Sequence, residues 1–400
     1  MHGISSRTRV KCSAYGAPVA GLLLSAVMLL GSPYAVAQSY ASRRSAVVIS
    51  KSERLDVRQS PYYKGYDYYA GRADQGAYGD GQIHPWHVQG NVWLMAGEPG
   101  ESNVAVQIGN NGALVVDTGT KEMAPKLLAV IQKISDEYGG DQKRIRWVVN
   151  TDELMDHIGG NYVIRNGGKT IVGSNFAFDN PGLTPGATVI GSLNSLTRMV
   201  IPNAKGQPAV AQGLWPNETH TEPLYSWDFN DEAVRLYHPA SANTDGNEMV
   251  MFRRSDVLAT GDVLNMVHYP IIDAKRGGSI DGELAALNQA MDLAVADFHM
   301  GPQEGGTMII PGHGRLCDQG DLVEYTIIIT TIRNRIMYYK NQGKSLKQVL
   351  ALKPTWDFDD RWGESTGSWN SQQFVQEVYE TLPAKGKAKD KFAMPAMASG

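Results

Sequence analysis

The stretch Asn150-Thr151-Asp152-Glu153-Leu154-Met155-Asp156-His157-Ile158-Gly159-Gly160-Asn161 decides how the rest of this chain is interpreted. It comes directly after Ile145–Val149, an apolar run typical of a buried strand, so its side chains stand where a strand ends. Carboxylate and imidazole side chains, which bind metal ions, stand here beside Leu154, which has no donor atom. The functional question is whether the polar residues of this stretch make a working metal site.

The stretch resembles the His-x-His-x-Asp-His-x-Gly-Gly signature of the metallo-β-lactamase superfamily, with Asp152 and Leu154 in place of the two leading histidines. Other segments resemble the remaining motifs of the family and follow in the same order. They are Val115-Val116-Asp117-Thr118-Gly119, Ala242-Asn243-Thr244-Asp245-Gly246-Asn247, Thr260-Gly261-Asp262 and Pro311-Gly312-His313-Gly314. The resemblance covers residues 85–383 and implies an α/β fold, the αββα sandwich in which mixed sheets are flanked by helices.

The substitutions separate by site when the chain is set beside family members that bind two metal ions. The first ion in those proteins is held by three histidines, which correspond to Asp152, Leu154 and Asn243. The second ion is held by residues that correspond to Asp156, His157, Asp262 and His313. Only the second set keeps the residue types of the family. Random decay would affect both sites, so this pattern favours loss of the first site and retention of the second.

The retained set implies a cofactor of one divalent metal ion. Its two carboxylates and two imidazoles suit Zn²⁺, with water completing the shell, so zinc is the predicted ion. The same donors also suit Fe²⁺ or Mn²⁺. The alternative is a degenerate scaffold in which these side chains only make hydrogen bonds.

The resemblance implies a metal-dependent hydrolase with a single ion that polarises a carbonyl or phosphoryl oxygen and activates water. Relatives in the family act on lactams, thioesters, lactones, phosphodiesters and sulfate esters. The predicted substrate is a small molecule of the ester, lactam or lactone type. The rival hypothesis is a non-catalytic protein that uses the same fold to bind a ligand without converting it.

Further residues are predicted to act beside the retained ligands. Asp156 is predicted to be catalytic as well as a ligand, and Asp152 is predicted to act as a general base, unless it only caps the following helix. Asn243, His268 and Tyr269 are predicted to contact the substrate. His268 is also a candidate substitute ligand, with an ordinary loop histidine as the alternative.

Residues 1–37 have the features of an export signal. Arg7, Arg9 and Lys11 precede an uncharged apolar run at 19–30, and Ala35-Val36-Ala37 forms a cleavage site. We therefore expect a mature protein without a transmembrane segment, exported to a bacterial periplasm. Its one remaining cysteine, Cys317, is interpreted as a small buried residue. A net charge of −4 without a long basic run in the domain argues against a nucleic-acid partner.

Four parts are expected along the chain: the signal at 1–37, a Tyr/Gly-rich leader at 38–84, the metallo-β-lactamase-like domain at 85–383 and a disordered tail at 384–400. Within the domain, alternating and apolar runs predict strands at 91–95, 104–108, 113–116, 145–149, 234–237, 249–252 and 256–258. Apolar residues at helical spacing predict helices at 121–138, 281–298, 321–341 and 372–381. Residues 174–225, rich in glycine, proline and asparagine, are predicted to form a long loop near the pocket, with His220 on the surface.

Overall fold

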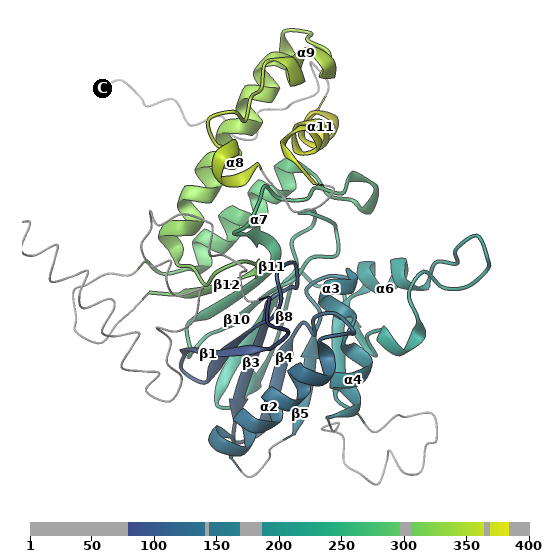
Figure 1. Cartoon of the computed structure of the whole chain (residues 1–400), viewed down its shortest axis with the longest axis vertical. Helices are drawn as coiled ribbons and strands as arrows, with labels where there is room; N and C mark the ends of the chain where they lie inside the picture. The colour runs from purple at the N-terminus through teal and green to yellow at the C-terminus, as the bar shows by residue number, and fades with distance from the viewer. Residues whose placement is uncertain (1–78, 141–143, 169–185, 297–305, 364–368, 384–400) are drawn as a thin grey trace, which may run out of the picture. The chain divides into compact units, whose positions relative to one another are not determined.

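The computed structural model describes residues 79–140, 144–168, 186–296, 306–363 and 369–383 (Figure 1). The predicted signal at 1–37, all of the leader up to residue 78 and the predicted tail at 384–400 lie outside these ranges. Among the described residues, no helix combines the length and the apolar character that crossing a bilayer requires.

The first sheet has seven strands in the order β1-β2-β3-β4-β5-β6-β7. Its strands are β1 (His84–Gln89), β2 (Val92–Ala96), β3 (Val104–Gly109), β4 (Gly112–Val116), β5 (Ile145–Val149), β6 (Thr188–Ser192) and β7 (Glu218–His220). Pairing is antiparallel from β1 to β4 and parallel from β4 to β7. Since parallel strands end at the same edge, the residues after β4 and β5 come together there.

The second sheet has five strands in the order β12-β11-β10-β9-β8. Its strands are β8 (Leu224–Phe229), β9 (Glu232–Tyr237), β10 (Met249–Phe252), β11 (Val257–Asn265) and β12 (Met308–His313). Only β11 and β12 pair in parallel, with Gly261 opposite Pro311 and Asn265 opposite His313. This register brings the Thr-Gly-Asp and Pro-Gly-His segments side by side.

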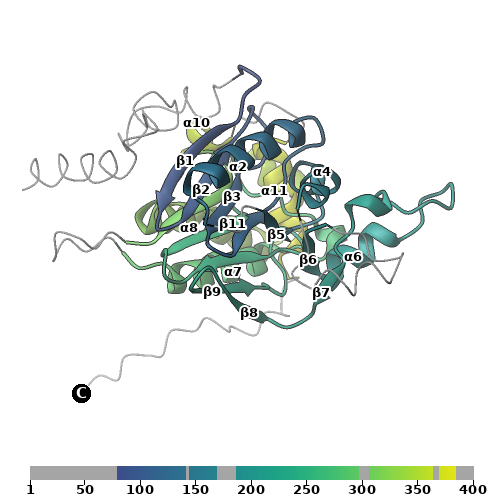
Figure 2. The same ribbon diagram turned by 90° about the horizontal axis from the view of Figure 1, so that it is seen from below.

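Apolar side chains from both sheets form one buried cluster, which includes Leu94, Leu114, Leu236 and Phe252. On the outer face of the first sheet, helix α2 (Ala124–Tyr138) buries Leu127, Ile131 and Ile134, and helix α4 (Asn161–Asn166) buries Ile164. On the outer face of the second sheet lie α7 (Ile280–Leu293) and α8 (Gln319–Asn341) (Figures 1 and 2). The predicted αββα sandwich of mixed sheets and flanking helices is therefore confirmed.

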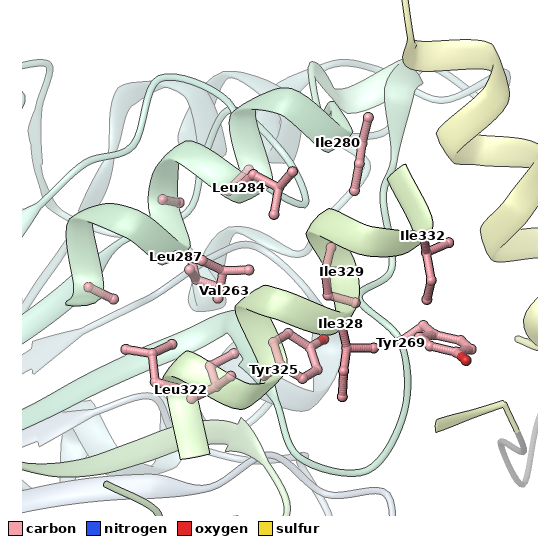
Figure 3. Close-up of a cluster of buried hydrophobic side chains, with 14 of the residues drawn as sticks. Val263, Tyr269, Ile280, Leu284, Leu287, Leu322, Tyr325, Ile328, Ile329 and Ile332 are labelled. Carbon is pink, nitrogen blue, oxygen red and sulfur yellow. The ribbon is translucent and has the colours of Figure 1, made fainter. Parts of the chain in front are cut away.

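The helical layer over the second sheet has its own apolar core. Figure 3 shows Val263 of β11 among leucines and isoleucines of α7 and α8, together with Tyr269 and Tyr325. Three C-terminal helices complete this layer, namely α9 (Leu346–Ala351), α10 (Asp359–Trp362) and α11 (Ser371–Thr381). Helix α8 begins at a capping box in which Asp318 and Asp321 bond each other's backbone N–H groups.

The prediction of a long loop at 174–225 is wrong for most of the residues in this range that the structure describes. Residues 186–225 include β6, helix α6 (Leu193–Val200), the 3₁₀ turn η4 (Gln212–Leu214) and β7. Apolar runs in this range, such as Val189-Ile190, are short, so glycine, proline and asparagine dominate its composition and suggest a loop. Strand β6 forms nevertheless, because it pairs with β5. Strands and helices predicted elsewhere are found, but the helix predicted at 281–298 ends at Leu293, and β11 extends through Asp262 to Asn265.

Candidate metal centre

Four side chains that the sequence assigns to a metal site converge in the fold. Asp156 and His157 lie in α3 (Met155–Ile158), the single turn after β5, whereas Asp262 lies in β11 and His313 ends β12. Asp262 Oδ1 is 3.3 Å from the Nε2 atoms of both His157 and His313. Asp156 Oδ2 is 3.2 Å from His313 Nε2 and 3.8 Å from His157 Nε2. At such separations Asp156, His157 and His313 form one group with the spacing of metal ligands, and His157 and Asp262 form a second one with Asp152.

Two glycines make this close approach of the strands possible. Gly261 has a φ of +51°, and a Cβ there would lie 2.5 Å from the side chain of Thr151. A Cβ at Gly312 would lie 2.4 Å from Asp262 Oδ1. Both contacts are shorter than atoms tolerate, so Gly312 leaves the room that Asp262 occupies and Gly261 leaves the room that Thr151 occupies.

A buried carboxylate behind the site orients His157. Asp117, with φ of 62° just after β4, accepts hydrogen bonds from Thr151 N–H at 2.8 Å and Thr151 Oγ1 at 2.6 Å. His157 Nδ1 also donates to Asp117, at 2.8 Å, which leaves Nε2 facing the other ligands. Sequence analysis assigned Asp117 only to a turn. Asp117 directly follows the apolar strand β4, and an acidic residue in this position could have indicated that it orients a ligand.

Three polar atoms of the cluster lack a hydrogen-bond partner among the described residues: Asp152 Oδ2, His157 Nε2 and Asp262 Oδ1. Their residues are 1%, 0% and 6% exposed. Leaving buried polar atoms unpaired is costly, unless an ion or water that bonds all of them lies between them. The donor set of carboxylate oxygens and imidazole nitrogens fits a divalent cation.

The electrostatics of the cluster also favour a cation. Burial by itself lowers the pKa of His157, but the surrounding carboxylates, Asp152 foremost, outweigh burial and raise the pKa well above its ordinary value. Burial raises the pKa of the Asp262 carboxyl, yet the imidazoles of His157 and His313 outweigh burial and lower it. Negative charge is therefore in excess, and positive charge is stabilised in this cavity.

Asp152, Leu154 and Asn243 replace the three histidines of the family's first metal site, and their surroundings differ. Asp152 is buried, its Oδ1 accepts from Leu154 N–H at 2.7 Å, and its Oδ2 lies 3.8 Å from His157 Nε2. Burial raises the pKa of this carboxyl well above its ordinary value. Leu154 is half-buried and contributes no donor atom. Asn243 is buried, and its Oδ1 has no hydrogen-bond partner among the described residues.

The two loop residues predicted to bind substrate have different surroundings. His268 is half-buried, with Nδ1 2.7 Å from the carbonyl of Tyr269; burial lowers its pKa, and His313 lowers it further. It therefore lies near the cluster. The Tyr269 ring is 1% exposed and stacks on Phe374 at 4.7 Å. The prediction that Tyr269 contacts the substrate is not supported, because its ring packs in the helical core (Figure 3).

The loop that carries the motif is anchored to α6. Glu153 accepts from Arg198 Nε at 2.6 Å and from Ser195 Oγ at 2.9 Å. Arg276 Nη1 lies 3.6 Å from the same carboxylate, and Arg198 also bonds Asp245. These ion pairs join the segment around Asp152 to α6 and to the loop that follows Asn243.

A second cluster, formed by Glu248, His220 and His238, was not predicted from the sequence. Glu248 is fully buried, with Oε1 3.1 Å from His220 Nε2 and 3.4 Å from His238 Nδ1. His220 is 5% exposed, so the prediction of a surface histidine is wrong: β7 turns this side chain toward the second sheet. His238 pairs with Glu248 and is not among the groups with metal-site spacing found in the described residues. Cys317 is buried, as predicted, and its thiol lies 3.5 Å from the Ile309 carbonyl.

Comparison with known proteins identifies the family and similar folds. The model of the metallo-beta-lactamase superfamily matches residues 97–293, which include Asp156, His157 and Asp262. No curated protein matches the chain. A double mutant of the sec-alkyl sulfatase PisA1 from Pseudomonas sp. is 14% identical, with a TM-score of 0.52 over 74% of this chain and 49% of that chain. The chain thus spans about half the length of that sulfatase.

Two metallo-beta-lactamases are also similar. DIM-1 is 16% identical, with a TM-score of 0.44 over 62% of this chain and 98% of that chain. The enzyme from Pontibacter korlensis is 17% identical, with a TM-score of 0.43 over 62% of this chain and 99% of that chain. At these identities the similarity to solved structures concerns the fold alone.

Proposed function

Because the chain belongs to the metallo-β-lactamase superfamily, whose members are metal-dependent hydrolases, we propose that it hydrolyses a small molecule with one divalent metal ion. The observation that supports this most is the convergence of Asp156, His157, Asp262 and His313 around buried atoms without partners. Zinc is the proposed ion, with iron or manganese as alternatives. One ion is proposed, since Leu154 offers no donor and Asn243 offers an amide where the family has imidazoles.

When bound, the ion supplies Lewis acidity, which polarises the substrate oxygen and acidifies water. The residues around it have separate tasks. Asp117 and Thr151 contact Nδ1 of His157 and hold the ring so that Nε2 faces the site, where it would bind the ion in place of a proton. Asp262 and His313 complete the set from the second sheet.

Asp156 is the proposed catalytic carboxylate. Its side chain is 30% exposed, whereas those of His157 and Asp262 are 0% and 8% exposed. Substrate and water therefore approach from the side of Asp156. One of its oxygens lies beside His313, which leaves the other to orient the attacking water and accept its proton. Asp152 as the general base remains the alternative.

The proposed substrate class is an ester, lactam or lactone, with Asn243 and His268 as substrate contacts. His268 lies close enough to Asp262 and His313 for their charges to affect its pKa. Asn243 presents a buried amide oxygen without a partner among the described residues. An amide and an imidazole beside the ion would orient the polar groups of such a substrate.

Metal analysis combined with an activity panel tests this function. Protein grown with added zinc, iron or manganese is analysed for metal and assayed on chromogenic esters, lactones, lactams and a secondary alkyl sulfate. We expect metal-dependent hydrolysis that falls by about 10²-fold or more in Asp156→Asn. Glu248→Gln, which removes a buried carboxylate from the other cluster, is the matched control. Protein that binds no metal would contradict the proposal.

Binding without catalysis is the second candidate function. It is favoured by one observation, the lack of imidazole at all three first-site positions, Asp152, Leu154 and Asn243. A metal-loaded protein that binds panel compounds and converts none of them would support this alternative.

We also propose export to a periplasm, with cleavage after Ala37, because of the charged, apolar and small-residue order of residues 1–37. N-terminal sequencing of protein from the periplasmic fraction should begin at Gln38. A protein that remains in the cytosol with residues 1–37 attached would contradict export.

A further inference from the structure

The two oxygens of Asp152 have different surroundings. Oδ1 accepts the Leu154 N–H at 2.7 Å, but the N-cap residue of α3 is Leu154 and has no side-chain cap, so Asp152 does not cap this helix. Oδ2 is buried without a hydrogen-bond partner among the described residues, and it lies within 4.8 Å of donor atoms of His157 and Asp262. A general base needs access to water, yet Asp152 is 1% exposed while the Asp156 side chain is 30% exposed. Oδ2 therefore faces the ligands rather than the solvent.

We propose that Asp152 is a fifth protein ligand of the ion, an inference that rests on the proposed function to the extent that an ion binds here. Ligands bound at about 2.1 Å lie about 3.0 Å apart when adjacent in an octahedron and about 4.2 Å apart when opposite. The separations from His157 Nε2 are 3.3 Å to Asp262, 3.8 Å to Asp156 and 3.8 Å to Asp152. All three fall inside this interval. Asp152 has ligand spacing with His157 and Asp262, and Asp156 has it with His157 and His313, so His157 is common to both groups.

The substitution of Asp152 then changes the character of the site. An imidazole at this position would serve a first ion, whereas the aspartate adds a third carboxylate to the remaining site. Three carboxylates with two neutral imidazoles leave the site with one net negative charge when a divalent ion is bound. Leu154, next along the loop, adds no competing donor.

An oxygen-rich site with five protein donors favours ions that accept more than four ligands. Zinc prefers four ligands in structural sites, while carboxylate-rich sets suit manganese, and mixed imidazole and carboxylate sets suit iron. Zinc still binds most nitrogen and oxygen sites more tightly than manganese in absolute terms. The proposal therefore concerns the ratio of the two affinities, which Asp152 shifts toward manganese.

Competition titrations of metal-free protein with Mn²⁺ and Zn²⁺ test the proposal. Wild type is compared with Asp152→Asn and Asp152→His, and Asp152→Glu keeps the carboxylate. We expect Asp152→Asn to lower the Mn²⁺ affinity by about tenfold or more, because it removes a ligand oxygen. Asp152→His should raise the ratio of Zn²⁺ to Mn²⁺ affinity by about tenfold or more. Paramagnetic resonance of bound Mn²⁺ should change in both variants.

Glu248→Gln is the control for removal of a buried carboxylate, and circular dichroism checks that each variant is folded. If wild type binds one ion and Asp152→Asn keeps its Mn²⁺ affinity within about twofold, the fifth ligand is disproved while the hydrolase proposal stands. If wild type binds neither ion, the proposed function itself fails. A folded Asp152→His variant with an unchanged affinity ratio would also overturn the inference, even if Asp152→Asn does not fold.

Discussion

Two buried clusters of histidines and carboxylates in this protein differ in their balance of charge. In the candidate metal centre, Asp156 lies at ligand spacing from His157 and His313, and Asp152 and Asp262 lie at ligand spacing from His157. In the second cluster, one carboxylate, Glu248, lies between His220 and His238. Each contains imidazoles within 4 Å of a buried carboxylate, so the residue types alone do not tell them apart.

The ratio of carboxylates to imidazoles explains why the two clusters differ in net charge. Three carboxylates with two neutral imidazoles need positive charge from outside, whereas buried atoms without a hydrogen-bond partner among the described residues occur in both clusters. One carboxylate between two imidazoles needs a single proton on either ring, which the cluster can take from solvent. We infer that the excess of carboxylate in the first cluster favours a metal ion there, whereas a single proton neutralises the carboxylate of the second cluster.

Loss of one ligand should give the largest effect and should separate the clusters. His313→Ala removes a ligand of the proposed ion, so we expect the metal affinity to fall by about 100-fold or more. Loss of a residue that only hydrogen-bonds to a ligand typically lowers metal affinity by about 10- to 100-fold. His238→Ala, the matched variant in the second cluster, should keep its metal. Elemental analysis after dialysis measures both. Equal metal loss in the two variants would remove the distinction between the clusters.

Chelation should lower the stability of the protein through the metal centre alone. An ion present at 1,000 times its dissociation constant stabilises the folded state by about 4 kcal/mol. Thermal unfolding with excess metal and with a chelator should therefore differ by several degrees in wild type and in Glu248→Gln. The gap should vanish in Asp262→Asn. A gap that Asp262→Asn preserves would place the stabilising ion elsewhere.

Restoring the lost histidines reverses the balance of donors in the metal centre. Asp152→His, Leu154→His and Asn243→His together should raise the metal content from one ion per chain toward two, with a gain in hydrolysis of a generic ester or lactam. Leu154→His carries the main risk, because an imidazole forced among packed neighbours costs about 1–3 kcal/mol. Elemental analysis of the folded triple variant decides. If the triple variant still binds at most one ion, the residues around these three positions no longer allow a first metal ion to bind.

The second cluster should respond to pH rather than to metal. Burial lowers the pKa of His220 and of His238, but Glu248 outweighs burial and raises both above their ordinary value of 6.5. Groups with a raised pKa stabilise the fold fully below the unfolded value, and this stability is lost as pH rises through the folded value. Other groups that affect the two rings are Asp245 and the backbone of Glu222 and of Asn247.

Denaturant unfolding of metal-free protein between pH 6 and pH 9 measures this effect, which we expect to be the smallest of the four. The free energy of unfolding of wild type, relative to Glu248→Gln, should fall as the pH rises. Wild type and Glu248→Gln should respond equally to added metal. Parallel pH profiles would show that the second cluster holds no extra proton in the folded state.

Much of the metal centre could be predicted from the sequence because its residues lie in short motifs. Asp156 and His157 follow an apolar strand, Asp262 lies in a Thr-Gly-Asp segment and His313 in a Pro-Gly-His segment. Turns and strand ends are local features, so the types of the ligands and the order of the elements follow from neighbouring residues. Tyr269 was misassigned because nearness along the chain to His268 does not determine which way a ring points.

The sequence by itself determined the positions of most strands and helices, since hydrophobic periodicity acts over a few residues, and its motifs implied the αββα fold through their resemblance to a known family. Only the tertiary structure decided which of these residues meet. Asp117 reaches His157 because β4 and β5 are parallel, and Asp152 Oδ2 faces Asp262 because the two sheets pack together. The pairing of His220 with Glu248 likewise joins β7 of the first sheet to the residue that precedes β10 of the second sheet. These contacts depend on register and packing between distant segments, which no local pattern specifies.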